Sequence, residues 1–488
     1  MSLQLLYDLG YETDSIVLIQ AALLLSTWSD IPPDHKDSWY WMGLATSLSY
    51  AVGLNYDPAA QDLSLREQKL RKRMWWTCYM RDRFLALGLH RPTRIKDQEF
   101  STPPLEAVDF ETIVLSRSSY SIGSNCPTLQ SVDLQLQLAD ICVYRAKLGV
   151  LIEAVLRLQA AYDQPGPLTS NIESQERMEQ QFRRVEDALD AWKQSLPDSC
   201  LLVRRPRANP PPTDGKAHLD IHRSHLHMLF HTMVYSLHRP RFLPTSPKQM
   251  NPTSRLSSDT SGAKVLASAL NISWIARELR NNKLDMYLPV SGVTILFPAM
   301  VVSLLEMKCQ DQAMQQGATS RFMACMKVME TLQQTYVVAD VTMSYLKAAL
   351  SRASIDLSLY DLVSESLEED ETPSDASESP TARLLEGDTS VPPGSIDLDL
   401  METTKTQEPD ITGHFYNHQS LVDQEHVEPS LLNGAPSNEG QQGLADDFTI
   451  PWDFGAEAFQ DLSSWLSLSA GDEDQELVAA LRELETSI

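Results

Sequence analysis

The chain has 488 residues, of which 66 are acidic and 40 are basic, so its formal net charge is −26. The excess is confined to one end. Residues 353–488 hold 31 acidic and three basic residues, a net charge of −28, whereas residues 1–352 carry +2. This partition excludes a uniformly acidic protein and predicts a nearly neutral globular body, residues 1–360, followed by an acidic appendage.

The hydrophobic pattern of the body predicts an all-α fold with many helices, and no alternating strand pattern interrupts it. Segments rich in Pro and Ser cannot propagate a helix, and they divide the body near residues 116–127, 204–216 and 240–260. The expected helices span residues 14–29, 37–53, 65–89, 131–162, 172–196, 216–238, 262–283, 291–315 and 318–358.

The helix expected at residues 65–89 has the clearest boundaries. Ser64 precedes Glu67 by three residues, which is the spacing of a capping box, so the helix begins near residue 65. Apolar side chains then recur at helical intervals, and Gly88 followed by Pro92 supplies the stop. One face of this helix is therefore apolar and the rest is charged.

Residues 71–100 alternate basic and aromatic side chains, and the pattern admits two interpretations. A basic strip with aromatic platforms is typical of nucleic-acid binding. A capped amphipathic helix instead places Trp75 and Trp76 in the core, because burying an indole removes a large apolar surface from water. The Arg-Asp-Arg triplet at residues 81–83 then forms a solvated or ion-paired face. The second interpretation is favoured.

The spacing of this segment closely resembles the signature of the fungal-specific transcription factor domain, also called the middle homology region of zinc-cluster regulators. The resemblance extends to residues 7–28 and 37–58, which are similar to two helices that precede the signature, and to residues 225–242, which are similar to a later helix. It covers about residues 5–350. The signature positions are Arg71, Arg73, Trp75, Trp76, Arg81, Asp82, Arg83, Gly88, Arg91, Pro92, Arg94 and Ile95.

The resemblance implies a nuclear regulator of RNA polymerase II transcription, acting on a metabolic or secondary-metabolite pathway. It implies zinc only in an N-terminal module, in which closely spaced cysteine thiolates bridge two metals. The six cysteines here are scattered without a Cys-x-x-Cys pair, so no cofactor is expected in this chain and its N-terminus is expected to be truncated. DNA binding is then expected only if a zinc cluster is restored or supplied by a partner.

Six histidines between residues 218 and 238 suggest a metal site at first sight. His218, His222 and His225 share one helical face, a geometry that can hold zinc. Only Asp220 is available to complete the set, and the intervening residues are typical of a core. An ordinary packing helix is the favoured interpretation.

Residues 287–305 are uncharged over nearly the length that a membrane-spanning helix needs. The segment contains Pro289, Gly292 and Pro298, and Asp285 and Glu306 flank it, so a core helix is expected and no membrane partner. The motifs of hydrolases, P-loop proteins, dinucleotide-binding folds and zinc proteases are missing from the sequence. We therefore expect a protein that is not an enzyme.

The acidic appendage divides into two parts. Residues 361–442 are rich in Pro, Ser, Glu and Asp with few aromatics, which predicts a disordered linker. Residues 443–488 set aromatic side chains among acids, the pattern of an activation segment whose apolar face enters a coactivator groove; the competing interpretation folds them onto the body as a terminal helix. The expected coactivator-binding residues are Trp452, Phe454, Phe459, Leu462, Trp465 and Leu466.

Two alternative functions stay open. One is a co-regulator without its own DNA-binding module, which titrates or heterodimerises with a full-length relative. The other is a small-molecule receptor or enzyme on an all-α scaffold. A homodimer or heterodimer and a small-molecule effector of the helical domain are compatible with the favoured interpretation as well.

Overall fold

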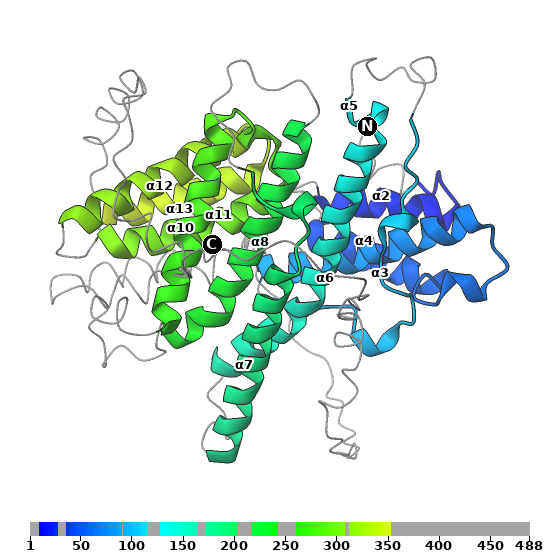
Figure 1. The fold of residues 1–488 in the computed structure, drawn as a ribbon, viewed down its shortest axis with the longest axis horizontal. Helices are drawn as coiled ribbons and strands as arrows, with labels where there is room; N and C mark the ends of the chain where they lie inside the picture. The colour runs from blue at the N-terminus through cyan, green and yellow to red at the C-terminus, as the bar shows by residue number, and fades with distance from the viewer. Residues whose placement is uncertain are drawn as a thin grey trace, which may run out of the picture. The chain divides into compact units, whose positions relative to one another are not determined.

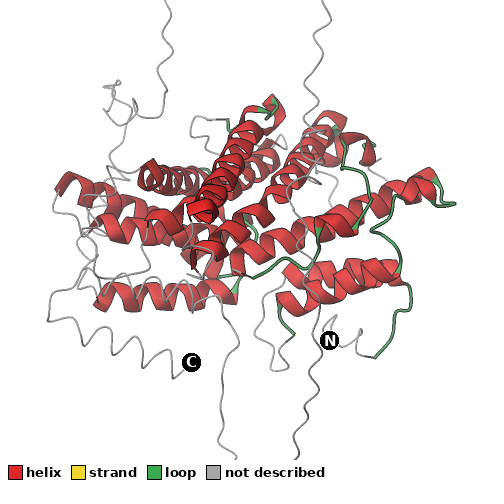
Figure 2. Ribbon diagram, turned by 90° about the horizontal axis from the view of Figure 1, so that it is seen from below, coloured by secondary structure: helices red, strands yellow, loops and turns green. Residues whose placement is uncertain are grey.

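A computed structural model describes residues 9–27, 36–89, 91–114, 127–163, 172–203, 216–242, 260–307 and 312–352. Within these ranges every regular element is a helix, as Figures 1 and 2 show. The all-α prediction is confirmed for this part of the chain. The predicted linker at 361–442 and the predicted activation segment at 443–488 lie outside the described residues.

The first three described helices share one core. They are α2 (Ser15–Thr27), α3 (Ser38–Ala51) and α4 (Leu65–Leu89), with the 3₁₀ turn η1 (Pro58–Ala60) between the last two. Helix α2 packs against α3, and both contact α4. Their buried side chains include Ile19, Trp41 and Met42. Burial of these apolar side chains orients α4, although nine of the 25 residues of that helix are charged.

The capping box predicted for α4 is present. The Ser64 N–H donates to Glu67 Oε2 at 3.1 Å, and the Glu67 N–H donates to Ser64 Oγ at 3.4 Å. Two N–H groups that the helix itself leaves free are thereby satisfied. The predicted helix 65–89 is confirmed at both ends.

The middle of the chain supplies the long helices that bridge the structure. After the turns η2 (Asp97–Glu99) and η3 (Ala107–Asp109) come α5 (Pro127–Gln130), α6 (Val132–Asp163), α7 (Ile172–Gln194), the turn η6 (Asp198–Cys200) and α8 (Lys216–Phe242). Helix α6 contacts α4, α7 and α8, and α8 contacts α7 as well. Helix α6 therefore links the N-terminal helices to the rest of the described fold.

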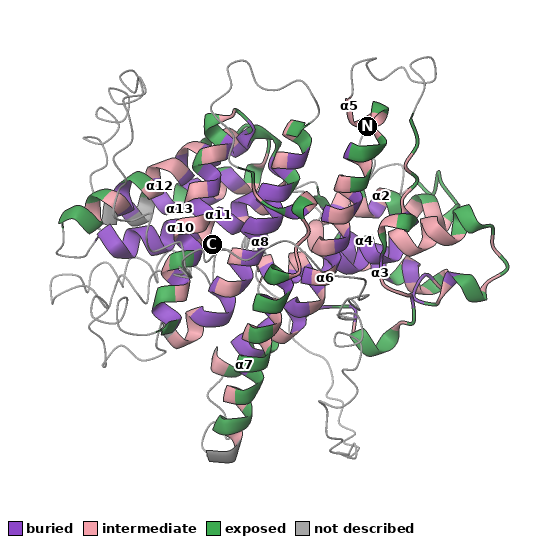
Figure 3. Ribbon diagram, viewed as in Figure 1, coloured by how far each residue is buried: buried purple, intermediate pink, exposed green. Residues whose placement is uncertain are grey.

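The last described elements are α10 (Thr260–Asn281), the turn η8 (Asp285–Tyr287), α11 (Ser291–Met307), α12 (Gln312–Gln333) and α13 (Val337–Arg352). Helix α11 contacts α4, α8, α10, α12 and α13, and it is buried along most of its length (Figure 3). Most of the uncharged stretch at 287–305 thus lies in a core, although Tyr287 at its start is exposed. Among the described helices, none combines the length and the apolar character needed to cross a membrane.

The single helix predicted for residues 318–358 is wrong. The structure ends α12 at Gln333 and begins α13 at Val337. At the break, the Tyr336 N–H donates to Leu332 O at 2.8 Å, and the Tyr336 hydroxyl donates to Leu288 O at 3.3 Å. A tertiary contact with a segment far away in sequence therefore accompanies the turn, and a local hydrophobic pattern does not reveal it.

Candidate functional site

The two signature tryptophans of α4 are buried in the hydrophobic core that α4 shares with α2 and α3. The exposed fraction is 0% for Trp75 and 2% for Trp76. Their rings meet Phe100, and Trp75 also meets Tyr50, in edge-on or tilted contacts. Trp76 Nε1 donates to Pro103 O at 2.7 Å. Because neither indole face is accessible, these tryptophans are not platforms for stacking nucleobases.

The basic residues at the start of α4 bind the segment that follows the helix. Arg73 donates to Asp109 O, Lys72 Nζ lies 2.8 Å from Asp109 Oδ2, and Lys69 Nζ donates to Val108 O. Together with the Trp76–Pro103 bond, these contacts hold residues 91–114 along α4. We call this set of contacts the signature clamp. The basic run is thus engaged within the protein rather than forming a free positive strip.

Asp82 adds two hydrogen bonds to the signature clamp. Its carboxylate accepts from the Arg94 N–H at 3.0 Å and from the Ile95 N–H at 3.1 Å. Burial raises the pKa of Asp82, and the N–H groups of Ile95 and Arg94 and the nearby arginines offset only part of that effect. The side chain fixes the turn after α4, and Ile95 is completely buried beneath it.

Arg83 ties the clamp to α6. Its exposed fraction is 0%, its Nη1 donates to Glu153 Oε2 at 2.7 Å, and its Nη2 donates to Asp97 Oδ1 at 2.6 Å. Its guanidinium also lies 4.6 Å from the centre of the Tyr79 ring. Burial lowers the pKa of Arg83, but the charges of Tyr79, Asp97 and Glu153 raise it overall. The ion-paired interpretation of the triplet agrees with this geometry.

Arg81, the other arginine of the triplet, points to α2. Its Nε donates to Ser26 Oγ at 3.1 Å, and its Nη2 donates to Ser26 O. Burial lowers the pKa of Arg81 to about 10, so the side chain stays charged at neutral pH. The triplet therefore connects α4 to three different partners: α2, the 91–114 segment and α6.

The arginines after α4 stack on one indole. The Arg94 guanidinium lies 4.1 Å from the centre of the Trp39 ring and the Arg91 guanidinium 5.3 Å from it. Arg94 Nη2 also donates to Trp39 O at 3.2 Å. A Cβ atom at Gly43 would come within 3.1 Å of this guanidinium, so the glycine leaves room for it.

The helix α4 ends at the predicted residue, but the interaction that closes it differs from the prediction. The Arg91 N–H donates to Ala86 O at 3.0 Å, which closes the helix just before Pro92. Gly88 lies within the helix, and an added Cβ there would meet Thr294 of α11 at 3.4 Å. This glycine therefore permits close packing of α4 on α11 and does not itself form the stop. Arg71 completes the signature by donating to Val52 O and Gln61 Oε1, both at 3.3 Å.

The histidines of α8 point to several different partners. His225 Nε2 lies 2.9 Å from Ser291 Oγ, and His227 Nε2 lies 3.0 Å from Cys200 O. His238 Nδ1 lies 3.2 Å from Ser261 Oγ, and His218 Nδ1 lies 2.8 Å from Thr128 Oγ1. Burial lowers the pKa of His231 to about 3, so its imidazole is neutral at pH 7. The packing role predicted for this helix agrees with these contacts.

The residues present do not fit a zinc site. Across the described ranges, no three His, Cys, Asp or Glu side chains come together in a way that could hold a metal ion. The described cysteines, Cys78, Cys142, Cys200 and Cys325, are all free. Burial raises the pKa of Cys78 to about 12 and that of Cys325 to about 11, which disfavours the thiolates that bind zinc.

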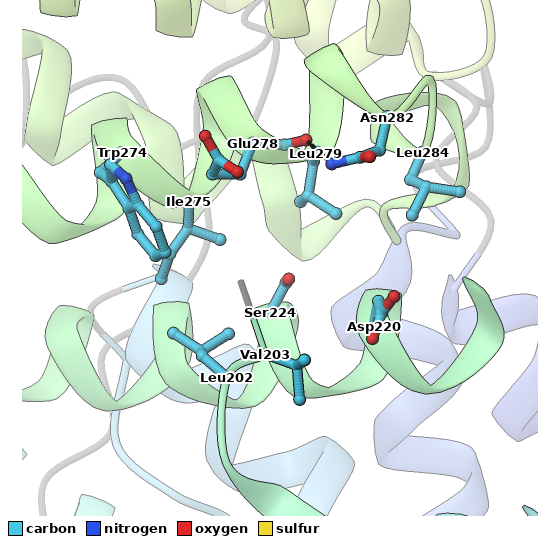
Figure 4. A pocket seen from close by; sticks show the side chains of 10 residues that line it. All are labelled: Leu202, Val203, Asp220, Ser224, Trp274, Ile275, Glu278, Leu279, Asn282 and Leu284. Atoms are coloured by element: carbon cyan, nitrogen blue, oxygen red, sulfur yellow. Dashed lines mark hydrogen bonds between the residues drawn. The ribbon is translucent and has the colours of Figure 1, made fainter. Parts of the chain in front are cut away.

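A small pocket lies between α8 and α10 (Figure 4). Asp220 and Ser224 face it from α8, while Trp274 and Glu278 face it from α10. Its volume is about 40 Å³, enough for a few water molecules. Ligand pockets usually enclose at least roughly 300 Å³. As shaped here, this pocket does not accommodate an effector.

Some important residues carry no sequence signal for their roles. Glu153 and Trp39 complete the arginine contacts, yet they lie on helices other than α4 and outside the signature. Arg145 and Lys147 are the two charged residues in an otherwise apolar stretch of α6, a local exception that the sequence does show. The expected coactivator-binding residues lie outside the described part of the chain.

Residues 1–194 match the family described as the fungal specific transcription factor domain. The chain is 40% identical to cutinase transcription factor 1 beta of Fusarium vanettenii, over 72% of this chain and 41% of that protein. It is 29% identical to the transcription factor cpaR of Aspergillus oryzae, over 62% and 51%, and 25% identical to the acetamidase regulatory protein of Aspergillus fumigatus, over 65% and 35%. No solved structure matches the chain.

The chain therefore spans about a third to a half of the length of these curated relatives. The signature clamp lies inside the matched range, and all three relatives are named as regulators or transcription factors. This chain carries a fungal-specific transcription factor domain, and the segment of α4 predicted to hold the family signature lies within the matched residues.

Proposed function

We propose that this chain regulates RNA polymerase II transcription in the nucleus, through a helical regulatory domain and an acidic activation segment. The observation that carries the proposal is the family signature on α4, in a chain that is 40% identical to a fungal transcription factor over 72% of its length. The proposed parts are the domain at residues 1–360, the linker at 361–442 and the activation segment at 443–488. A metabolic or secondary-metabolite pathway is the proposed target, and catalysis is not part of the proposal.

The described residues have a scaffolding role in this function. Trp75 and Trp76 are buried, and several basic residues of α4 are bound to the 91–114 segment or to other helices, so these groups do not read bases. DNA recognition requires side chains delivered to base edges by an element that fits a groove. In our proposal a zinc cluster, restored or supplied by a partner, provides that element, and residues 443–488 recruit coactivators.

The test joins the full chain to a heterologous DNA-binding domain and measures a reporter gene. We expect activation, and we expect its loss when Trp452, Phe459 and Trp465 are replaced by alanine. Replacing Phe415 and Tyr416 by alanine, in the predicted linker, is the matched control and should leave activation unchanged. Absence of activation, or equal activation by all three proteins, would refute the role of the tail.

A second candidate function is a co-regulator that acts through a full-length relative. It is favoured by the absence of a metal-binding cluster or an exposed basic-aromatic strip among the described residues. Purified full chain should then fail to shift promoter DNA alone and should enter the complex when a full-length relative is added. A DNA shift by the chain alone would exclude this candidate.

A further inference from the structure

The hydroxyl of Ser224 on α8 points into the small pocket between α8 and α10 (Figure 4). The exposed fraction of Ser224 is 8%, and in the described structure no hydrogen bond reaches its side chain. Other buried hydroxyls behave differently: those of Thr232, Ser273 and Ser303 each donate to the backbone carbonyl four residues earlier, at 2.9 Å. Burying a hydroxyl without a partner costs free energy, so we expect a group in the pocket that bonds to Ser224.

A carboxylate without an ion pair lines the same pocket from α10. Glu278 is partly buried, and among the described residues no hydrogen bond or ion pair reaches its side chain. Asp220, the other acidic residue of the lining, has its Oδ1 atom 3.6 Å from Arg223 Nη1, so an arginine balances its charge. The described lining contains no Lys, Arg or His side chain. The pocket is therefore left with one unbalanced negative charge, that of Glu278.

The rest of the lining suits a small cation with an apolar stem. Val203, Trp274 and Ile275 supply an apolar wall, and an indole attracts a cation that lies over its face (Figure 4). Asn282 Nδ2 donates to Glu278 O at 2.8 Å, which leaves the amide oxygen of Asn282 as an acceptor. The volume of about 40 Å³ restricts any occupant to a few atoms.

We propose that the pocket between α8 and α10 binds the ammonium group of a small alkylamine. An ammonium group donates hydrogen bonds to Ser224 Oγ and to the Glu278 carboxylate, and its single positive charge neutralises Glu278. A water molecule would satisfy the hydroxyl but would leave that charge unpaired. A metal ion fits less well, because in the described ranges no three metal-binding side chains come together. This binding goes beyond the proposed function and does not depend on it.

The test uses the full chain labelled with 5-fluorotryptophan and titrates methylammonium chloride at constant ionic strength. Fluorine NMR follows the signal of Trp274, which Trp274→Phe identifies among those of the nine tryptophans. We expect a saturable shift with a Kd in roughly the millimolar range, because a ligand with so few atoms cannot bind tightly. Glu278→Gln should weaken binding by at least about tenfold, and Ser224→Ala by about two- to tenfold.

Two controls separate the proposed site from general effects of charge. Glu330→Gln, the same substitution at an exposed position of α12, should leave the Kd unchanged. Tetramethylammonium carries the same charge without an N–H donor, and potassium carries it without directed hydrogen bonds. Neither ion should shift the Trp274 signal saturably.

Absence of a saturable shift in the wild type, or equal binding by Glu278→Gln, would overturn the site. Binding of tetramethylammonium or potassium as tight as that of methylammonium would overturn the assigned class. Circular dichroism checks that Ser224→Ala is folded; if it is not, the Glu278→Gln variant, at a partly exposed position, carries the test.

Discussion

Arg83 and Arg145 are both arginines packed into the helical body, yet their surroundings are opposite. Arg83 is completely buried, with the carboxylate oxygens of Asp97 and Glu153 at 2.6 and 2.7 Å. Arg145 has no hydrogen bond or ion pair in the described structure, and its titratable neighbours include imidazoles that it helps to keep neutral. The first arginine joins three segments; the second joins none.

The comparison distinguishes a completely buried arginine that is paired with carboxylates from a partly buried arginine that is not. Around Arg83, attraction to two carboxylates offsets the cost of removing the guanidinium from water, so the charge specifies which segments meet. Around Arg145, no group of the described residues pairs with the guanidinium, and the side chain stays partly exposed to water.

The largest effect is expected when the stability of Arg83→Met is compared with that of Arg145→Met. Arg83→Met leaves the buried Glu153 carboxylate without its main partner, so the free energy of unfolding should fall by about 3–5 kcal/mol. Arg145→Met removes a partly exposed charge that has no partner among the described residues, so stability should stay the same or rise by up to about 2 kcal/mol. Urea unfolding of both variants measures the difference. Equal losses would show that pairing does not distinguish the two sites.

Asp82→Ala should produce the next largest loss. The substitution removes the acceptor of the Arg94 and Ile95 N–H groups, and hydrogen bonds to a charged group contribute about 1.5–3 kcal/mol. Residues 91–114 should also become more sensitive to limited proteolysis. Asp190→Ala, at an exposed position of α7, is the control and should change stability by less than about 0.5 kcal/mol.

Acidification should destabilise the histidine region by about 2 kcal/mol for each of His225 and His231 at pH 5. The folded pKa values of His225 and His231 lie below the unfolded value of about 6.5, so the unfolded chain binds more protons between that value and the folded pKa. Stability should therefore fall as the pH drops below 6.5. Denaturation at pH 7 and pH 5, with His231→Phe as the less sensitive variant, checks this.

A pH titration of the histidines also distinguishes the two arginines. Arg145→Met removes a positive charge beside His222 and His225, so the pKa of both imidazoles should rise. A histidine-selective NMR titration would detect the shift. Arg83→Met should leave these two values unchanged, because its charge does not act on either imidazole.

The smallest expected effect compares Trp76, whose indole N–H has a partner, with Trp75, whose indole N–H has none. Trp76 Nε1 donates to Pro103 O, whereas Trp75 Nε1 is buried without a partner. Both indoles are almost fully buried, so replacement by phenylalanine removes a similar apolar volume at each position. Trp76→Phe should cost about 1 kcal/mol more than Trp75→Phe in urea unfolding. A larger loss at Trp75 would contradict this assignment.

Much of the local structure could be predicted because its causes are local. The Ser64–Glu67 capping box fixes the start of α4, and the spacing of apolar residues fixes its length and its buried tryptophans. The break between α12 and α13 could not be predicted in this way. It depends on Tyr336 reaching Leu288, and a helical pattern carries no information about so distant a contact.

By itself, the sequence determined the all-α class of the described residues, the family signature and the separation of charge between the two ends of the chain. These depend on residue type and spacing along the chain. Only the tertiary structure decided that Arg83 is paired and that Arg145 has no partner among the described residues. Partners of a buried charge come from other helices, such as Glu153 on α6 for Arg83, so their presence or absence is set by packing and not by neighbours in sequence.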